Sequence, residues 1–146
     1  LVEALEKGNY NYLDRSKMSP RESLMAAYDA DIFLSSANAV TNDGILINID
    51  GNSNRVSCIA QGPRKVVFIV GINKVCSDLD SAMKRARNVA APVNAQRFDL
   101  NIPCRETGKC FDCKSMDTIC CQFLITRYSR HTDRIHVILV NDTIGY

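Results

Sequence analysis

Two uninterrupted apolar runs predict strands that are buried on both faces. Ile32-Phe33-Leu34 follows Asp31, and Val66-Val67-Phe68-Ile69-Val70 ends at Gly71. Consecutive apolar residues are typical of strands whose two faces are both covered, as in parallel sheets. We therefore expect strands over residues 31–36 and 66–70, near the centre of the core.

Two segments with helical spacing carry strong start signals. Ser19-Pro20, followed by Glu22, has the residues of a capping box with proline in the first turn. The apolar side of that helix would hold Leu24, Met25 and Tyr28. Asp78 begins a second helix that reaches about Ala91-Pro92. Its sheet-covering face is expected to consist of Leu79, Ala82, Met83, Ala86, Val89 and Ala90, while Lys84, Arg85 and Arg87 point into solvent.

Turn-forming residues between apolar segments predict two hairpins. Residues 45–50 and 55–60 flank Gly51-Asn52-Ser53-Asn54, and residues 122–128 and 134–141 flank a polar stretch. Helices interleaved with strands indicate an α/β fold with a mixed sheet flanked by helices. A chain of 146 residues is long enough for one domain with its own core.

The first residues predict an interrupted helix. Leu1 to Lys7 has the pattern of the last turns of an amphipathic helix that Gly8 stops, and Tyr10 to Leu13 follows as a short strand. Because no N-cap precedes this helix, we expect residues 1–146 to be a single domain that is N-terminally incomplete. Leu1, Val2 and Leu5 should then pack against the sheet.

Composition narrows the class of function. Eighteen Lys+Arg against sixteen Asp+Glu leave a net charge of +2 without a basic stripe, which disfavours a nucleic-acid partner. No apolar run approaches the roughly 18 residues of a membrane span, and no signal peptide opens the chain. Seven clustered cysteines without a secretory signal are more typical of metal or redox chemistry, and they favour a cytoplasmic location. A homo-oligomer is compatible with this composition.

Five of the seven cysteines lie in a loop over residues 104–121. A Cys-x2-Cys pair lets two thiolates reach one metal ion from a tight turn. The adjacent Cys120 and Cys121 would face opposite sides of an extended backbone, so one of the two is expected to ligate. The spacing predicts a metal centre whose ligands are Cys104, Cys110, Cys113 and Cys120.

Several states of this loop stay open. Four thiolates at irregular spacing suit a 4Fe-4S cluster. Zinc, which takes four tetrahedral ligands, is the alternative metal. Reduced thiols or a disulfide would need no metal at all. Cys58 and Cys76 lie in apolar surroundings and are expected to be small buried hydrophobic residues.

Small polar residues follow two of the predicted strands and suggest a site for an anion. In open α/β sheets, ligands bind beyond the carboxyl ends of the strands. The residues expected to line this site are Ser35, Ser36, Asn38, Asn42, Asp43, Gly44, Arg55, Gly71, Asn73 and Lys74. Ordinary turns would use the same residue types. No catalytic residue can be assigned, because neither a Ser/His/Asp set nor a glycine-rich phosphate loop is present.

Several motifs together resemble the LUD (lactate-utilisation) domain family. They are Asn38-Ala39-Val40-Thr41-Asn42-Asp43-Gly44, Gly71-Ile72-Asn73-Lys74, Arg87-Asn88-Val89-Ala90-Ala91-Pro92, Thr107-Gly108-Lys109-Cys110 and Ile119-Cys120. The resemblance covers nearly the whole chain and is closest to short stand-alone members with a C-terminal four-cysteine motif. It implies a fold like that of ribose-phosphate isomerase and the CoA transferases.

The resemblance also implies three kinds of function. The first is a metal-containing component, iron–sulfur or zinc, of anaerobic organic-acid metabolism such as lactate utilisation, working beside iron–sulfur redox partner proteins. The second is a domain that binds, or isomerises, a phosphorylated or carboxylated metabolite. The third is a non-catalytic assembly subunit. Whether the chain is an enzyme stays open, because a shared fold does not fix a function.

Overall fold

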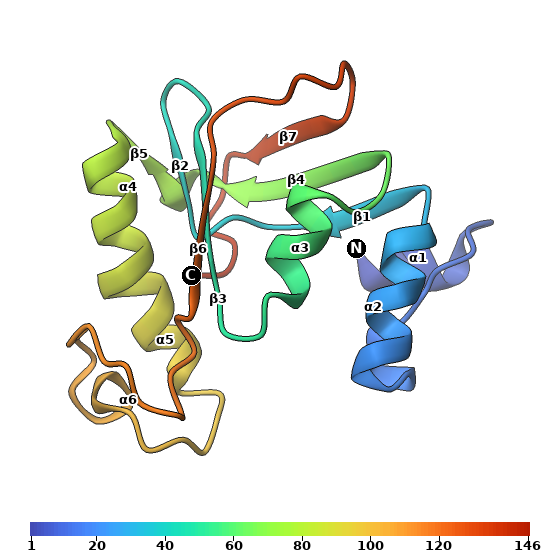
Figure 1. Ribbon diagram of the computed structural model, residues 1–146. Coiled ribbons are helices and arrows are strands. Elements are labelled where there is room, and N and C mark those ends of the chain that lie inside the picture. The colour runs from blue at the N-terminus through green and yellow to red at the C-terminus, as the bar shows by residue number, and fades with distance from the viewer.

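The chain forms two sheets flanked by helices in the computed structural model, which describes residues 1–146 (Figure 1). One sheet is parallel, with the strand order β1-β4-β7. The other is mixed, with the order β5-β2-β3-β6. The strands are β1 (Ile32–Ser35), β2 (Ala39–Thr41), β3 (Leu46–Asp50), β4 (Lys65–Gly71), β5 (Val75–Cys76), β6 (Gln122–Thr126) and β7 (Ile135–Val140). The predicted α/β class with mixed strand directions is confirmed.

Two of the helices, α2 and α4, begin where the sequence signals place them. The capping box of Ser19 and Glu22 opens α2, and Asp78 forms a second capping box with Ser81 at the start of α4. The helical segments are α1 (Val2–Lys7), η1 (Arg15–Lys17), α2 (Pro20–Asp29), α3 (Asn54–Ala60), η2 (Ile72–Lys74), α4 (Leu79–Arg85), η3 (Ala86–Ala90), α5 (Ala91–Ala95) and α6 (Pro103–Thr107). The segment η3 is a π-helix between α4 and α5, so the three form one continuous helical rod.

Three apolar clusters make up the interior. The largest joins the inner face of the parallel sheet, centred on Phe68, to Leu46 and Ile59. The second packs Ile47 of β3 against Ala82 and Ala86 of the helical rod. The third, smaller cluster joins Ala95, Ile102 and Cys104 at the base of the cysteine loop.

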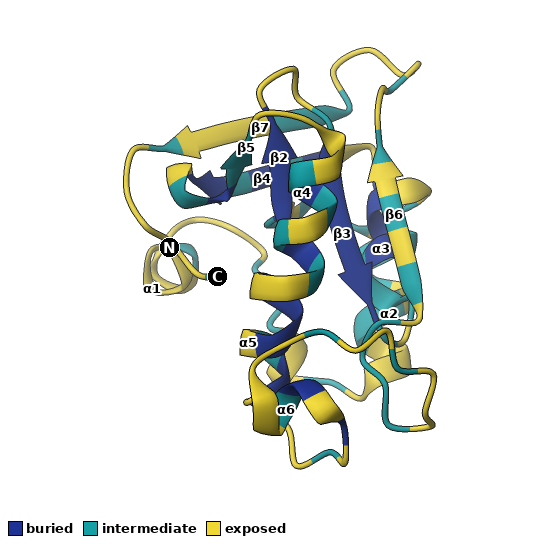
Figure 2. Cartoon of the chain, turned by 90° about the vertical axis from the view of Figure 1, so that its left-hand side faces the viewer, coloured by how far each residue is buried: buried dark blue, intermediate teal, exposed yellow.

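The outer face of the parallel sheet is not covered, which corrects the prediction of strands buried on both faces. Ile32 is 50 % and Leu34 37 % exposed, and Ile138 of β7 is 51 % exposed. Figure 2 shows β7 largely exposed, whereas β2 and β3 are buried. The side chains of Phe33 in β1 and Phe68 in β4 lie on the inner face of the sheet, where they pack into the core.

Neither predicted hairpin forms. Residues 45–50 contain β3, but Asn54–Ala60 is the helix α3, because the buried carboxylate of Asp50 binds the first backbone N–H groups. β6 pairs with β3 and β7 pairs with β4, so the two closing strands lie in different sheets. Alternating apolar and polar residues on both sides of a polar stretch occur in hairpins. The same pattern occurs here in a strand followed by a helix and in two strands that belong to different sheets.

The N-terminal predictions are only partly correct. α1 forms, but none of its residues is buried, and Leu1 and Val2 are 69 % and 52 % exposed instead of packing on the sheet. Tyr10 to Leu13 forms no strand. In the helical rod, Leu79 and Val89 are exposed, so the buried face is made of alanines and Pro92. No helix has the length and apolarity needed to cross a bilayer.

Candidate functional site

The three parallel strands end at one edge, and the polar loops that follow them meet there. Ser36 follows β1, Asn73 and Lys74 follow β4, and residues 141–146 follow β7. Parallel strands necessarily bring their carboxyl ends to the same side of a sheet. This edge therefore collects side chains from three distant parts of the sequence.

Lys74 is a buried ammonium at this edge. It is only 5 % exposed, and its Nζ lies 3.1 Å from the Ser36 hydroxyl oxygen. Burial lowers the pKa of Lys74 below its ordinary value, and the neighbouring charges of Arg85 and Arg55 lower it further. A charge removed from water is costly unless an opposite charge offsets it.

Arg55 and Arg85 complete a group that we call the basic cluster (Arg55, Lys74 and Arg85). Arg55 donates from NH2 to the Asn38 side-chain oxygen at 3.0 Å and to the Ile49 carbonyl at 2.7 Å. Arg85 donates from Nε to the Asn73 carbonyl at 3.0 Å. Burial lowers the pKa of both guanidinium groups.

No carboxylate is paired with the basic cluster. None of the salt bridges in the structure involves its three side chains. The charge of Asp50 acts on Arg55, but the Asp50 oxygens already accept backbone N–H groups at the start of α3. Asp50 therefore offsets part of the charge of Arg55, but no carboxylate forms an ion pair with any side chain of the cluster.

A buried acceptor without a donor lies beside the same loop. Asn48 is fully buried, and its Nδ2 donates to the Ser36 carbonyl at 3.0 Å, but its Oδ1 has no hydrogen-bond partner. Most buried polar atoms are hydrogen-bonded, so an exception of this kind marks a place where a donor is missing.

The last residues of the chain lie over the basic cluster. The Asn73 side chain donates from Nδ2 to the Gly145 carbonyl at 3.2 Å and accepts from the Ile144 N–H at 3.4 Å. A Cβ on Gly145 would lie 3.2 Å from the Lys74 ammonium. The Tyr146 hydroxyl hydrogen-bonds the side chains of Asn94 and Arg97. The C-terminal segment therefore spans from the sheet edge to α5.

The structure brings together only part of the residue set expected from the sequence. Ser36, Asn38, Arg55, Asn73 and Lys74 are linked by the contacts above, and Ser35 and Gly71 end the strands beside them. The remaining three, Asn42, Asp43 and Gly44, form the turn between β2 and β3 at the opposite end of β2 from Asn38. They do not reach the basic cluster.

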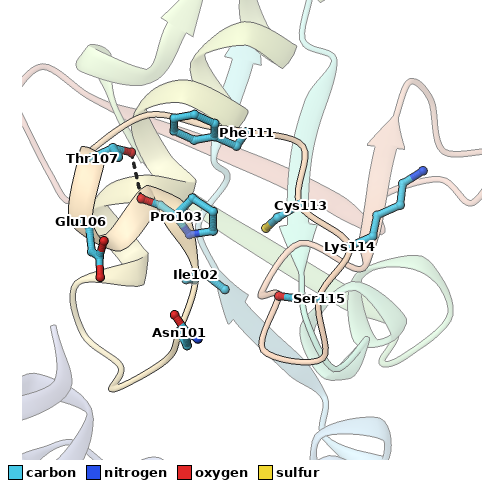
Figure 3. A pocket seen from close by; sticks show the side chains of 9 residues that line it. All are labelled: Asn101, Ile102, Pro103, Glu106, Thr107, Phe111, Cys113, Lys114 and Ser115. Carbon is cyan, nitrogen blue, oxygen red and sulfur yellow. Dashed lines mark hydrogen bonds between the residues drawn. The ribbon is translucent and has the colours of Figure 1, made fainter.

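The cysteine loop lies at the far end of the helical rod. Cys104 is in α6, Gly108 ends that helix in a left-handed conformation, and Asp112 between Cys110 and Cys113 also has a positive φ of 53°. A hollow of about 600 Å³ lies between α6 and residues 111–115 (Figure 3). The Cys113 sulfur points into this hollow, whereas Lys114 points away from it.

The four predicted ligands influence one another electrostatically. Burial raises the pKa of Cys120 to about 12, with further increases from the charges of Cys104, Cys110 and Cys113. Cys121 is exposed, and all seven cysteines are free thiols. As the chain stands, no three His, Cys, Asp or Glu side chains lie close enough together to hold a metal ion. The thiols are thus gathered in one region without being in coordination geometry.

Sequence reasoning missed three side chains of these two sites. Arg85 and Arg87 were expected to point into solvent, but Arg85 joins the basic cluster, and Arg87 donates to Cys110 and Asp112. Asn48 was taken as an ordinary strand residue. Periodicity alone could not reveal these contacts, because the partners of Arg85 and Arg87 lie 12 to 47 residues away in the sequence. The position of Asn48 inside the apolar run Ile45 to Ile49 could have indicated a buried polar side chain.

Comparison with known proteins gives one match. The family model of the LUD domain matches residues 1–140. No curated protein and no solved structure matches the sequence. The α/β architecture with mixed sheets is consistent with the ribose-phosphate isomerase-like fold that this domain implies.

Proposed function

Because the chain belongs to the LUD (lactate-utilisation) domain family, we propose that it binds a small carboxylated or phosphorylated metabolite at the basic cluster. The observation that supports this most is the burial of Lys74, 5 % exposed, without a carboxylate partner. Family membership connects the chain with lactate-utilisation functions only at the level of the family.

An anion would relieve the electrostatic cost that the protein carries at this edge. Its oxygens could accept hydrogen bonds from Lys74 and Ser36, and its charge would offset Arg55 and Arg85. Charged hydrogen bonds of this kind contribute about 1.5–3 kcal/mol each. The favoured ligands are therefore compact anions with a phosphate or carboxylate group.

Calorimetric titration with inorganic phosphate and with acetate, at constant ionic strength, tests this proposal. Removing the Lys74 ammonium in Lys74→Met should weaken binding by about 10- to 100-fold. Lys84→Met is the matched control, because Lys84 is exposed on α4 and should leave the affinity unchanged. Equal binding to the wild type and Lys74→Met, or none to the wild type, would contradict the proposal.

A second function is supported by the cysteine loop. We infer that Cys104, Cys110, Cys113 and Cys120 hold an iron–sulfur cluster or zinc, because burial and then the nearby charges of the other three thiols raise the pKa of the half-buried Cys120. Four thiolates are a suitable donor set for either metal, although the sulfurs must first move closer together. A bound cluster would supply one-electron transfer to iron–sulfur redox partners, and zinc would order the loop.

Metal analysis and absorption spectra of protein purified without oxygen test this second function. Cys110→Ser and Cys113→Ser should lose the metal, since each removes one thiolate of the chelating pair. Cys121→Ser is the control, because Cys121 is exposed and lies outside the proposed set. Full metal content in both loop variants would exclude these ligands.

The two sites together favour a component of anaerobic organic-acid metabolism. An anion site and a metal site that contact the same helical rod, through Arg85 and Arg87, would suit a protein that handles an organic acid beside redox partners. If neither phosphate, acetate nor metal binds, a non-catalytic assembly subunit becomes the favoured function.

A further inference from the structure

One arginine of the helical rod bonds the cysteine loop at two points. Arg87 donates from NH2 to the Asp112 carboxylate at 2.7 Å and to the Cys110 sulfur at 3.6 Å. Its partners lie within Cys110-Phe111-Asp112-Cys113, the chelating pair of the loop. A single guanidinium therefore fixes the turn between two proposed ligands.

The helical rod directs Arg87 toward this turn. Ala86 and Ala90, at the two ends of η3, are fully buried, and Ala86 packs against β3. Arg87 follows Ala86 directly and leaves the rod on the side of the loop. Short π segments inside helices often occur at functional sites, where they change the direction of a side chain.

The residue that Arg87 holds has an unusual backbone. Asp112 has a φ of 53°, in the left-handed region that residues other than glycine seldom adopt. Aspartate tolerates this region better than most residues. The left-handed residue lies between Cys110 and Cys113, so it sets the direction of the backbone that joins the two thiols.

We propose that Arg87 and Asp112 form a clamp that holds the Cys110–Cys113 segment close to the helical rod, so that its thiols have less far to move when metal binds. This inference rests on the proposed metal centre. Asp112 is 73 % exposed on its side chain, and ion pairs at such surfaces contribute about 0–1 kcal/mol to stability. The effect of the clamp therefore lies in the position of the thiols and in the positive charge beside them.

Titration with Zn²⁺ against a competing chelator tests the clamp. Arg87→Ala should weaken zinc binding by about 10- to 100-fold, as is usual when a residue that orients a metal ligand is lost. Arg105→Ala is the matched control, because it removes the neighbouring exposed pair with Asp99 without touching a thiol. Equal affinity of Arg87→Ala and the wild type would overturn the proposal.

Substitution of Asp112 by glycine distinguishes two possible effects of this residue on zinc affinity, namely its ion pair with Arg87 and the strain of its left-handed backbone. Asp112→Gly makes the left-handed conformation easy but removes the partner of Arg87. If the clamp matters, Asp112→Gly binds zinc more weakly than the wild type. If relief of strain dominates, it binds as tightly or more tightly, and the clamp is contradicted.

Hydrogen exchange of the metal-free protein distinguishes failure of the clamp from failure of the metal centre. Backbone amides of residues 109–114 should exchange faster in Arg87→Ala than in the wild type. A wild type that binds no zinc would refute a zinc site, while this exchange difference would still establish that Arg87 holds the segment. Identical exchange in both proteins would refute the clamp even if zinc binds.

Discussion

At the scale of single residues, the basic cluster is assembled from parts of the chain that lie far apart in the sequence. Lys74 was placed at the anion site because it follows a predicted strand, and Arg55 because the predicted strand that it begins could pair beside the site. Arg85 was not, because its neighbours Lys84 and Arg87 made it part of a basic stretch on a helix. The contacts that bury it, to the carbonyls of Asn38 and Asn73, come from parts of the chain 47 and 12 residues away.

The lowered pKa of Lys74 predicts a stability that rises with pH. In the window between the folded pKa and the ordinary value of 10.5, the unfolded chain binds more protons at Lys74 than the folded chain does. The free energy of unfolding should therefore increase as pH rises through this window. Lys74→Met should remove that increase, as urea unfolding at a series of pH values would detect; parallel pH profiles would contradict the prediction.

At the scale of elements, start signals of helices were predicted well and strand pairings poorly. A helix cap is formed by residues only three or four positions apart in the sequence. The starts of α2 and α4 can therefore be predicted from Ser19 and Asp78 and the residues that follow them. The partner of a strand is set by distant residues, so β6 and β7 could not be assigned to different sheets in advance.

α3 depends on the carboxylate of Asp50. The oxygens of Asp50 accept from the backbone N–H groups of Asn52, Arg55 and Val56, and the residue is 8 % exposed. Asp50→Ala should reduce the free energy of unfolding by about 1–3 kcal/mol, because buried donors lose their acceptor. Urea unfolding measures this loss, and Asn52→Ala, an exposed change in the same turn, should have almost none.

The cap of α4 should respond to acid. Hydrogen bonds from Ser77 and Ser81 lower the pKa of Asp78 to about 2. A depressed carboxyl pKa stabilises the folded state fully above the ordinary value of 3.8, and this contribution is lost as pH falls through about 2. As the pH is lowered between these two values, the melting temperature of the wild type should fall more steeply than that of Asp78→Asn, because the Asn side chain does not titrate.

At the scale of the whole molecule, Gly71 keeps the C-terminal segment on the sheet edge. A Cβ there would lie 2.3 Å from the Asn73 side-chain oxygen and 2.7 Å from the Ile144 nitrogen, closer than real atoms approach. Gly71→Ala should therefore displace residues 142–146, speed their hydrogen exchange and weaken phosphate binding at the basic cluster. Unchanged exchange would show that the segment does not depend on this close approach.

The parallel pairing of β4 with β7 also sets an order for synthesis on the ribosome. Val66 pairs with Ile135, so the apolar strand β4 lacks its second neighbour until the ribosome has added about 70 further residues. A nascent chain that ends before residue 135 presents an open, hydrophobic strand edge, which readily pairs with other chains. The three-stranded parallel sheet can therefore close only after β7 has left the ribosome, and until then the edge of β4 is exposed to aggregation.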